Sequence, residues 1–298
     1  MKTPQTEVPA LARAFGLTIP VYLKREDLHQ YGSHKGRSIP LMIKMYAKDG
    51  IREFVISSSG NAALTAIRII AQHNKNNPSK KINLTIFVGK NILNDKLNTL
   101  EQEIRSLKSE VQLIQVHRPK QTALQYEKEH GAKLLRQSTD NLALAGYKEL
   151  ANELNKIKNL QAIFIPASSG TTAQAMGEAF QTLGQDPQIH IVQSQACHPI
   201  VDYVRNTKET LSISPSIASA IVDRVAHRKE AVANIIVRSK GGAWMVSDDE
   251  IREAIKLVKQ TTSVNISPNS ALSIAGLKKA VVSGFSFSAP VVCLVTGP

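Results

Sequence analysis

Residues 164–173 read FIPASSGTTA, and this stretch decides which fold the chain can adopt. An apolar run of the kind found in buried strands ends at Pro166, a turn of Ser and Gly follows, and a helical pattern begins at Thr172. Residues 54–63, FVISSSGNAA, repeat this order, and residues 292–297, VCLVTG, end a third apolar run with Thr and Gly. Strands that lead through small-residue turns into helices are typical of parallel βα units.

The rest of the chain alternates in the same way between short β-rich runs and helical patterns. We expect strands at Val21–Leu23, Phe54–Ser57, Leu84–Val88, Val111–Gln115, Ala162–Pro166, His190–Gln193, Ala243–Val246 and Val291–Val295. We expect helices from near Ile39 and at Asn61–His73, Asn94–Leu107, Thr122–His130, Gly146–Lys156, Thr172–Leu183, Asp248–Lys259 and Ser270–Val282, with Ser270 as an N-cap. The sequence therefore predicts an α/β protein with open, twisted, mostly parallel sheets flanked by helices.

The composition is typical of a globular protein, and the length is sufficient for two α/β lobes. The chain has 298 residues, of which 42% are hydrophobic and 20% are charged. We predict no membrane partner, because no window approaches the ~20 apolar residues of a spanning helix. Cys197 and Cys293 lie in apolar surroundings, which favours buried thiols over disulfides or a metal site. With no signal pattern at the N-terminus, these features predict a cytoplasmic location.

The formal net charge of +13 first suggests nucleic acid as a partner. The basic residues are scattered, however, and only 5% of the residues are aromatic, so a base-stacking platform is difficult to assemble. We therefore predict no nucleic-acid partner. A basic surface instead favours the capture of anionic substrates and of a phosphorylated cofactor.

The two Ser/Gly turns are candidate anion sites. In open α/β sheets, ligands gather beyond the carboxyl ends of the strands, where the first N–H groups of helices are directed at anions. Residues 164–173 therefore predict a phosphate cradle, although they match neither the GxxxxGK[ST] loop nor the GxGxxG fingerprint. Each turn taken alone is equally well explained as an ordinary helix start.

One lysine has an unusual setting. Lys35 belongs to YLKREDLHQYGSHKGR, residues 22–37, and lies in a turn between Gly32 and Gly36 just before an apolar helix. Most lysines are solvated surface charges. A lysine in such a turn can instead be buried, and burial lowers the pKa of the amine enough for Schiff-base chemistry.

These residues resemble a known family. LKREDL at 23–28, followed by GSHKGR at 32–37, is similar to the KREDL…GSxKxR signature of fold-type II pyridoxal 5′-phosphate (PLP) enzymes, the tryptophan synthase β-chain-like superfamily. The resemblance extends along the chain through SSGN at 58–61, NLALAGYK at 141–148, SPNSA at 267–271 and VTG at 295–297.

The resemblance implies a role for each matching position. Lys35 would be the catalytic Schiff-base lysine, Asn61 would bond the phenolic oxygen of PLP, and Thr296 would meet the pyridine nitrogen. The phosphate would be held by Ser168, Ser169, Gly170, Thr171 and Thr172. The carboxylate of an amino-acid substrate would be bound by Ser58, Ser59, Gly60 and Asn61. No metal site is expected.

The resemblance also implies an architecture and a reaction. Residues 1–39 and 141–298 would form a large PLP-binding domain and residues 40–140 a small mobile domain, with the cofactor between the lobes. Homodimers are common in this family. A hydroxyl rather than a carboxylate at the pyridine nitrogen suits elimination and replacement better than transamination. We therefore expect a lyase that removes the α-proton of a small amino acid.

Within the family, VQSQACHPIV at 192–201 and GGAWMVSDDE at 241–250 look most like threonine synthase, which converts O-phosphohomoserine and water to threonine and phosphate. Other segments are similar to threonine and serine dehydratases or to cysteine synthase. His34 and Gly36 stand where threonine synthases usually have Phe and Asp, and Ser267 replaces a common Glu. Three alternatives stay open: a threonine synthase-like lyase, a dehydratase or β-replacing enzyme, and a catalytically silent PLP-binding regulatory paralogue.

Overall fold

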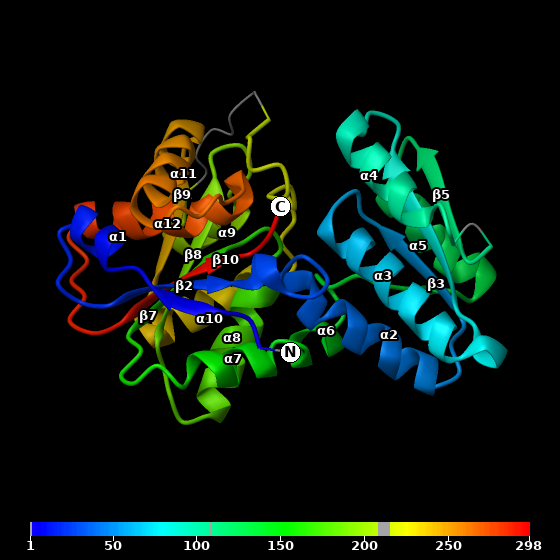
Figure 1. Cartoon of the computed structure of the whole chain (residues 1–298), viewed down its shortest axis with the longest axis horizontal. Helices are drawn as coiled ribbons and strands as arrows, with labels where there is room; N and C mark the ends of the chain where they lie inside the picture. The colour runs from blue at the N-terminus through cyan, green and yellow to red at the C-terminus, as the bar shows by residue number, and fades with distance from the viewer. Residues whose placement is uncertain (1, 108, 208–214) are drawn as a thin grey trace. The chain divides into compact units, whose positions relative to one another are not determined.

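The computed structural model describes residues 2–107, 109–207 and 215–298, and the chain divides into two compact units (Figure 1). Unit 1 contains the N-terminal segment to His29 and everything from Tyr147 onward, and unit 2 contains Gln30–Gly146. The sequence prediction had placed residues 30–39 and 141–146 in the large domain, whereas their contacts place them in unit 2. The functional division into a cofactor-binding domain and a mobile domain stays a prediction.

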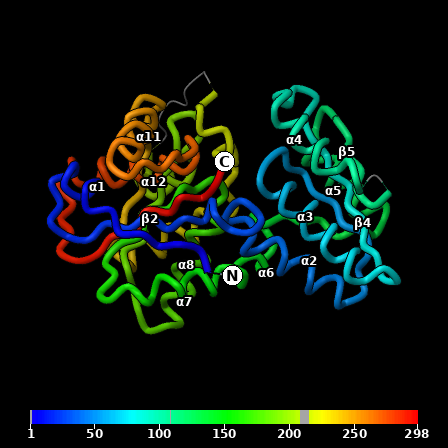
Figure 2. Tube along the Cα trace, viewed as in Figure 1, coloured from blue at the N-terminus to red at the C-terminus, as the bar shows by residue number. Residues whose placement is uncertain are grey.

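Unit 1 is built on a six-stranded sheet. Its order is β1 (Gln5–Glu7), β2 (Val21–Arg25), β10 (Val291–Val295), β7 (Ala162–Pro166), β8 (Gln188–Ser194) and β9 (Gly242–Val246). Every neighbouring pair is parallel except β1 and β2. Figure 2 shows β10, at the red end of the chain, beside the blue β2, so the two ends of the sequence meet in one sheet.

Helices cover both faces of this sheet. The unit 1 helices are α1 (Pro9–Ala14), α7 (Lys148–Leu154), α8 (Thr171–Thr182), α9 (Pro199–Arg205), α10 (Lys229–Ser239), α11 (Asp248–Thr262) and α12 (Pro268–Val282). α12 packs on β7 to β10 with α11 against it, while α8 and α10 pack on β8 from the other side (Figure 1). The apolar residues of strands such as β7 and β10 are buried throughout, as a sheet covered on both faces requires.

Unit 2 is a smaller sheet of the same kind. Its order is β5 (Val111–Val116), β4 (Asn83–Gly89), β3 (Glu53–Ser57) and β6 (Lys133–Leu134), and all pairs are parallel. Its helices are α2 (Ile39–Lys48), α3 (Asn61–Asn76), α4 (Asn94–Ile104), α5 (Pro119–His130) and α6 (Leu142–Ala145). α3 packs with α2 and α4, and α5 covers β3 and β4. Short 3₁₀ turns η1 (Glu26–Leu28), η2 (His34–Arg37) and η3 (Pro78–Lys80) are also present in the described part of the chain.

The predicted fold class and all eight predicted strands are confirmed. The helix at Asp248 is confirmed too, and Ser247 and Glu250 cap it reciprocally. The assignment of Ser270 as an N-cap was wrong. Ser267 caps α12 by accepting the N–H of Ser270, because Pro268 occupies the first helical position, where its missing N–H is not needed.

Both cysteines are buried thiols outside any disulfide, as predicted. Burial raises the pKa of the Cys293 thiol, which keeps it protonated and unreactive. No helix in the described part of the chain is long and apolar enough to cross a membrane.

Candidate active site

Lys35 lies in η2, directly before α2, in unit 2. Its side chain retains some surface exposure, yet enough protein surrounds the amine that burial lowers its pKa from 10.5 to about 8. Among the described residues, the amine makes no hydrogen bond or ion pair. At a pKa of about 8, roughly a tenth of the Lys35 amine is neutral at pH 7. An amine in this state would suit a nucleophile.

The loop before Lys35 is anchored to α3. The guanidinium of Arg68 donates to the carbonyl of Tyr31 at 3.0 Å, and the Tyr31 hydroxyl donates to Gln72 at 2.6 Å. Arg68 also forms an ion pair with Glu103 of α4. These contacts fix the approach of the chain to Lys35 from the helix that begins at Asn61.

Close packing fixes the other side of η2. A Cβ added to Gly146 would lie 2.3 Å from the carbonyl oxygen of Arg37, so only glycine allows the end of α6 to approach this turn. Gln137 donates a hydrogen bond to the hydroxyl of Ser38, the residue between η2 and α2. Lys35 is therefore placed by packing and hydrogen bonds on both sides of its turn.

The first Ser/Gly turn connects β3 to α3 in the same unit. Ser58 accepts the N–H of Gly60 at 3.3 Å, and α3 begins at Asn61 without a side-chain cap. α3 also packs against η2. The structure thus brings the turn of Lys35 against the helix whose start carries Asn61 and the predicted carboxylate-binding residues Ser58, Ser59 and Gly60.

The second Ser/Gly turn connects β7 to α8 in unit 1. Gly170 has φ +86°, and an added Cβ would lie 2.9 Å from Val232, so both the backbone and the packing require glycine there. The hydroxyls of Ser169 and Thr171 are 2.9 Å apart. Like α3, α8 begins without a side-chain cap, so its first turn is suited to binding an anion.

The Ser168 hydroxyl also makes hydrogen bonds that the sequence did not predict. Its hydroxyl oxygen accepts the N–H groups of Val222 and Asp223 at 3.1 and 3.2 Å. The hydroxyl hydrogen is left to donate. Ser168 therefore ties a segment more than fifty positions along the chain to the turn at the end of β7.

Thr296 follows β10, which neighbours β7 in the sheet, so Thr296 and the Gly170 turn come from the same edge of unit 1. Thr296 is buried. The next residue, Gly297, donates its N–H to Ser270 at 3.1 Å, and its carbonyl accepts the hydroxyl of Ser267 at 2.6 Å. The start of α12 thus holds the backbone that carries Thr296.

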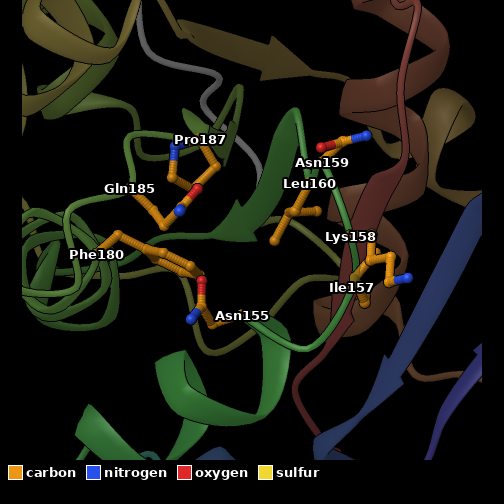
Figure 3. Close-up of a pocket in the computed structure, with 8 residues that line it drawn as sticks. All are labelled: Asn155, Ile157, Lys158, Asn159, Leu160, Phe180, Gln185 and Pro187. Carbon is orange, nitrogen blue, oxygen red and sulfur yellow. The ribbon is translucent and has the colours of Figure 1, made fainter.

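A pocket of about 260 Å³ lies elsewhere in unit 1 (Figure 3). It is lined by Asn155, Ile157, Lys158, Asn159, Leu160, Phe180, Gln185 and Pro187. These residues come from the segments that precede β7 and β8 or from the end of α8, at the amino ends of the strands. Within unit 1, the Gly170 turn and Thr296 follow the carboxyl ends of β7 and β10, so this pocket lies at the opposite ends of the strands from them.

PLP needs an amine for its aldehyde and donors for its phosphate, and each unit taken by itself contains groups of one of these kinds. In unit 2, the Lys35 amine would fit the aldehyde, and in unit 1, the hydroxyls and the helix start at the Gly170 turn would fit the phosphate. Two buried hydroxyls near the Lys35 turn, Ser33 and Thr65, have no hydrogen-bond partner among the described residues. Unpartnered buried polar groups of this kind are expected beside a polar ligand.

Comparisons with known proteins agree with this chemistry. A family described as "Pyridoxal-phosphate dependent enzyme" matches residues 1–297. Threonine synthase of Methanocaldococcus jannaschii is 26% identical over 303 residues, covering 93% of this chain and 69% of that protein.

Two solved structures have the same fold. Maize serine racemase superposes with a TM-score of 0.81 at 17% identity, covering 100% of this chain and 88% of that one. Threonine deaminase isoform 2 of Solanum lycopersicum superposes with a TM-score of 0.80 at 20% identity, covering 100% of this chain and 79% of that one. The family match along nearly the whole chain decides the assignment. The chain belongs to the pyridoxal-phosphate dependent enzymes of fold type II.

Proposed function

We propose that the chain is a lyase that removes the α-proton of a small amino acid and then eliminates or replaces a side-chain group, with O-phosphohomoserine as the substrate, as in threonine synthase. The observation that carries this proposal is the Lys35 amine, which has a pKa of about 8 and makes no hydrogen bond or ion pair among the described residues. Similarity to threonine synthase along 93% of the chain supports the choice of substrate.

Taken by itself, each unit contains groups that would hold the cofactor. In unit 1, the turn from Ser168 to Thr172 would bind the cofactor phosphate, and the Thr296 hydroxyl would meet the ring nitrogen. In unit 2, Asn61 would bond the phenolic oxygen. PLP, when bound, withdraws electrons from the α-carbon of a substrate amino acid.

The protein's own residues would position the substrate and move its protons. Ser58, Ser59 and Gly60 would fix the substrate carboxylate through hydroxyls and N–H groups, which sets the orientation of the α-hydrogen. The neutral amine of Lys35 would accept the α-proton and return a proton to the side-chain carbon. A pKa near 8 suits both steps, because the same group must act as base and as acid near neutral pH.

Steady-state assays of the PLP-loaded protein test the proposal with four substrates. O-phosphohomoserine should release phosphate and yield threonine, whereas serine, threonine and O-acetylserine plus sulfide should turn over at least about tenfold more slowly in kcat/KM. Lys35→Ala is the control and should be inactive on all four. Faster turnover of serine or threonine would replace the proposal by a dehydratase. No turnover by a protein that binds PLP would indicate a silent regulatory paralogue.

Two further expectations belong to this proposal. Assembly as a homodimer is expected from the family, and sedimentation of the purified protein would measure it. A cytoplasmic location is expected from the composition, and fractionation of cells would test it.

A further inference from the structure

Gln193, at the end of β8, joins the predicted phosphate turn to the start of α9 with a buried side chain. Its amide nitrogen donates to the carbonyls of Ala167 and Ser168 at 3.1 and 3.4 Å. Its amide oxygen accepts the N–H groups of Ile200 and Val201 at 2.9 and 3.1 Å. One neutral side chain thus bonds four backbone groups, and its bonds to Ala167, Ile200 and Val201 are buried.

These bonds determine which way the turn faces. In a trans peptide the C=O and the N–H of the following residue point in opposite directions. Because Gln193 draws the carbonyls of Ala167 and Ser168 toward itself, the N–H groups of Ser168 and Ser169 are directed away from it. An anion bound on the side of the turn opposite Gln193 would therefore meet these two N–H groups rather than the carbonyl oxygens of Ala167 and Ser168.

Gln193 also supports the turn indirectly, through α9. By accepting the N–H of Ile200 it fixes the first turn of that helix. The Ile200 side chain packs beneath Gly170, where an added Cβ would lie 3.3 Å from its Cδ1. Gln193 therefore supports the turn directly at its carbonyls and indirectly beneath its glycine.

We propose that Gln193 is a positioning residue for phosphate recognition, which aims the N–H groups of the turn after β7 at the phosphate of PLP. This inference rests on the proposed role of that turn as the phosphate site. An ionised glutamate at position 193 could still accept from α9, but it could donate to neither carbonyl and would place a negative charge behind an anion site.

The affinities for PLP and for pyridoxal, which lacks the phosphate, test this inference. They are measured on the apo form of the full chain by titration of the visible absorbance. In Gln193→Glu and in the uncharged Gln193→Met, the preference for PLP over pyridoxal should fall at least about tenfold, while pyridoxal affinity stays within about twofold of wild type. Ser239→Ala is the matched control, since it removes a buried hydroxyl that accepts the N–H of Ile189 near the other end of β8. It should leave the preference unchanged.

Each outcome decides between two claims. If wild type prefers PLP and both Gln193 variants keep that preference, or lose affinity for PLP and pyridoxal equally, the inference about Gln193 is overturned and the turn remains the phosphate site. If wild type binds pyridoxal as tightly as PLP, the proposed phosphate site itself fails.

Discussion

Trp244 donates its indole N–H to Nδ1 of His190 at 3.1 Å, which fixes the imidazole as the tautomer with hydrogen on Nε2, facing Gln188 at 3.2 Å. His190 also stacks on Phe164, with the ring centroids 4.4 Å apart. Burial among these rings lowers the pKa of His190 from 6.5 to about 3. The neutral imidazole is therefore part of the unit 1 core, and its protonation opposes folding.

His190 should make stability depend on pH in a defined window. The unfolded chain binds the proton near pH 6.5 and the folded chain only near pH 3, so this contribution to stability falls as pH drops between these values. The loss should reach about 4 kcal/mol by pH 3. His190→Gln keeps an acceptor for Trp244 and should flatten the slope, as measured by urea unfolding from pH 7 to 4. Replacement of the exposed His117 by Gln is the control. Equal slopes in all three proteins would contradict this account.

A buried ion pair joins β2 to α7 in unit 1, and its lysine also bonds the chain just before β1. The Lys24 amine contacts the Glu153 carboxylate and donates to the carbonyl of Thr3 at 2.8 Å, with both charged side chains buried. Lys24→Met removes the buried ammonium that contacts this carboxylate and should cost about 3–5 kcal/mol of unfolding free energy. Adding Glu153→Leu should restore part of the loss, as chemical denaturation would show. A double variant less stable than Lys24→Met would refute the pairing argument.

Gly170 and Gly184 form a matched pair for testing the cradle. Both have positive φ, but an added Cβ would meet Val232 and Ile200 at Gly170 and nothing within 4 Å at Gly184. Gly184→Ala should cost about 1 kcal/mol and leave PLP affinity unchanged. Gly170→Ala should cost about 2–4 kcal/mol and weaken PLP binding. Thermal unfolding of the apo forms and PLP titration measure both effects, and equal PLP affinities would argue against the cradle.

The depressed pKa of Lys35 predicts how the protein takes up its cofactor. The neutral amine is the nucleophile, so below pH 8 the rate of PLP attachment should fall about tenfold for each pH unit. Stopped-flow absorbance of apo protein mixed with PLP should show a plateau above about pH 8. A rate that keeps rising toward pH 10.5 would mean that the reacting amine is an ordinary exposed lysine.

Much of the fold was predictable because burial leaves a clear pattern. β7 at Ala162–Pro166 and β10 at Val291–Val295 are apolar along their length, and both predicted ranges match the structure. The two-residue β6 was not predicted. Two residues are too few to show a strand pattern in the sequence, and β6 is recognised only by its pairing with β3. α10 was missed as well, since it starts at Lys229 without a side-chain cap and is held by packing on α8 and α9.

The site residues remain predictions, and the sequence could suggest them because they lie in short continuous motifs. Gln193 could not be recognised in this way. Its four partners belong to two other segments. The parallel pairing of β7 with β8 brings residues 167–168 to Gln193, and the turn from β8 into α9 brings residues 200–201 back to it. The segment around Val222 has no regular pattern either, yet its N–H groups meet Ser168.

The central claim is that Lys35 carries the cofactor, and borohydride reduction of the PLP-loaded protein tests it most directly. Reduction makes the bond between amine and aldehyde permanent, and mass spectrometry of a digest then locates it. The account predicts one phosphopyridoxyl group per chain on the peptide that contains Lys35, and none in Lys35→Ala protein that keeps its fold. A label on another lysine, or equal labelling of wild type and Lys35→Ala, would contradict it.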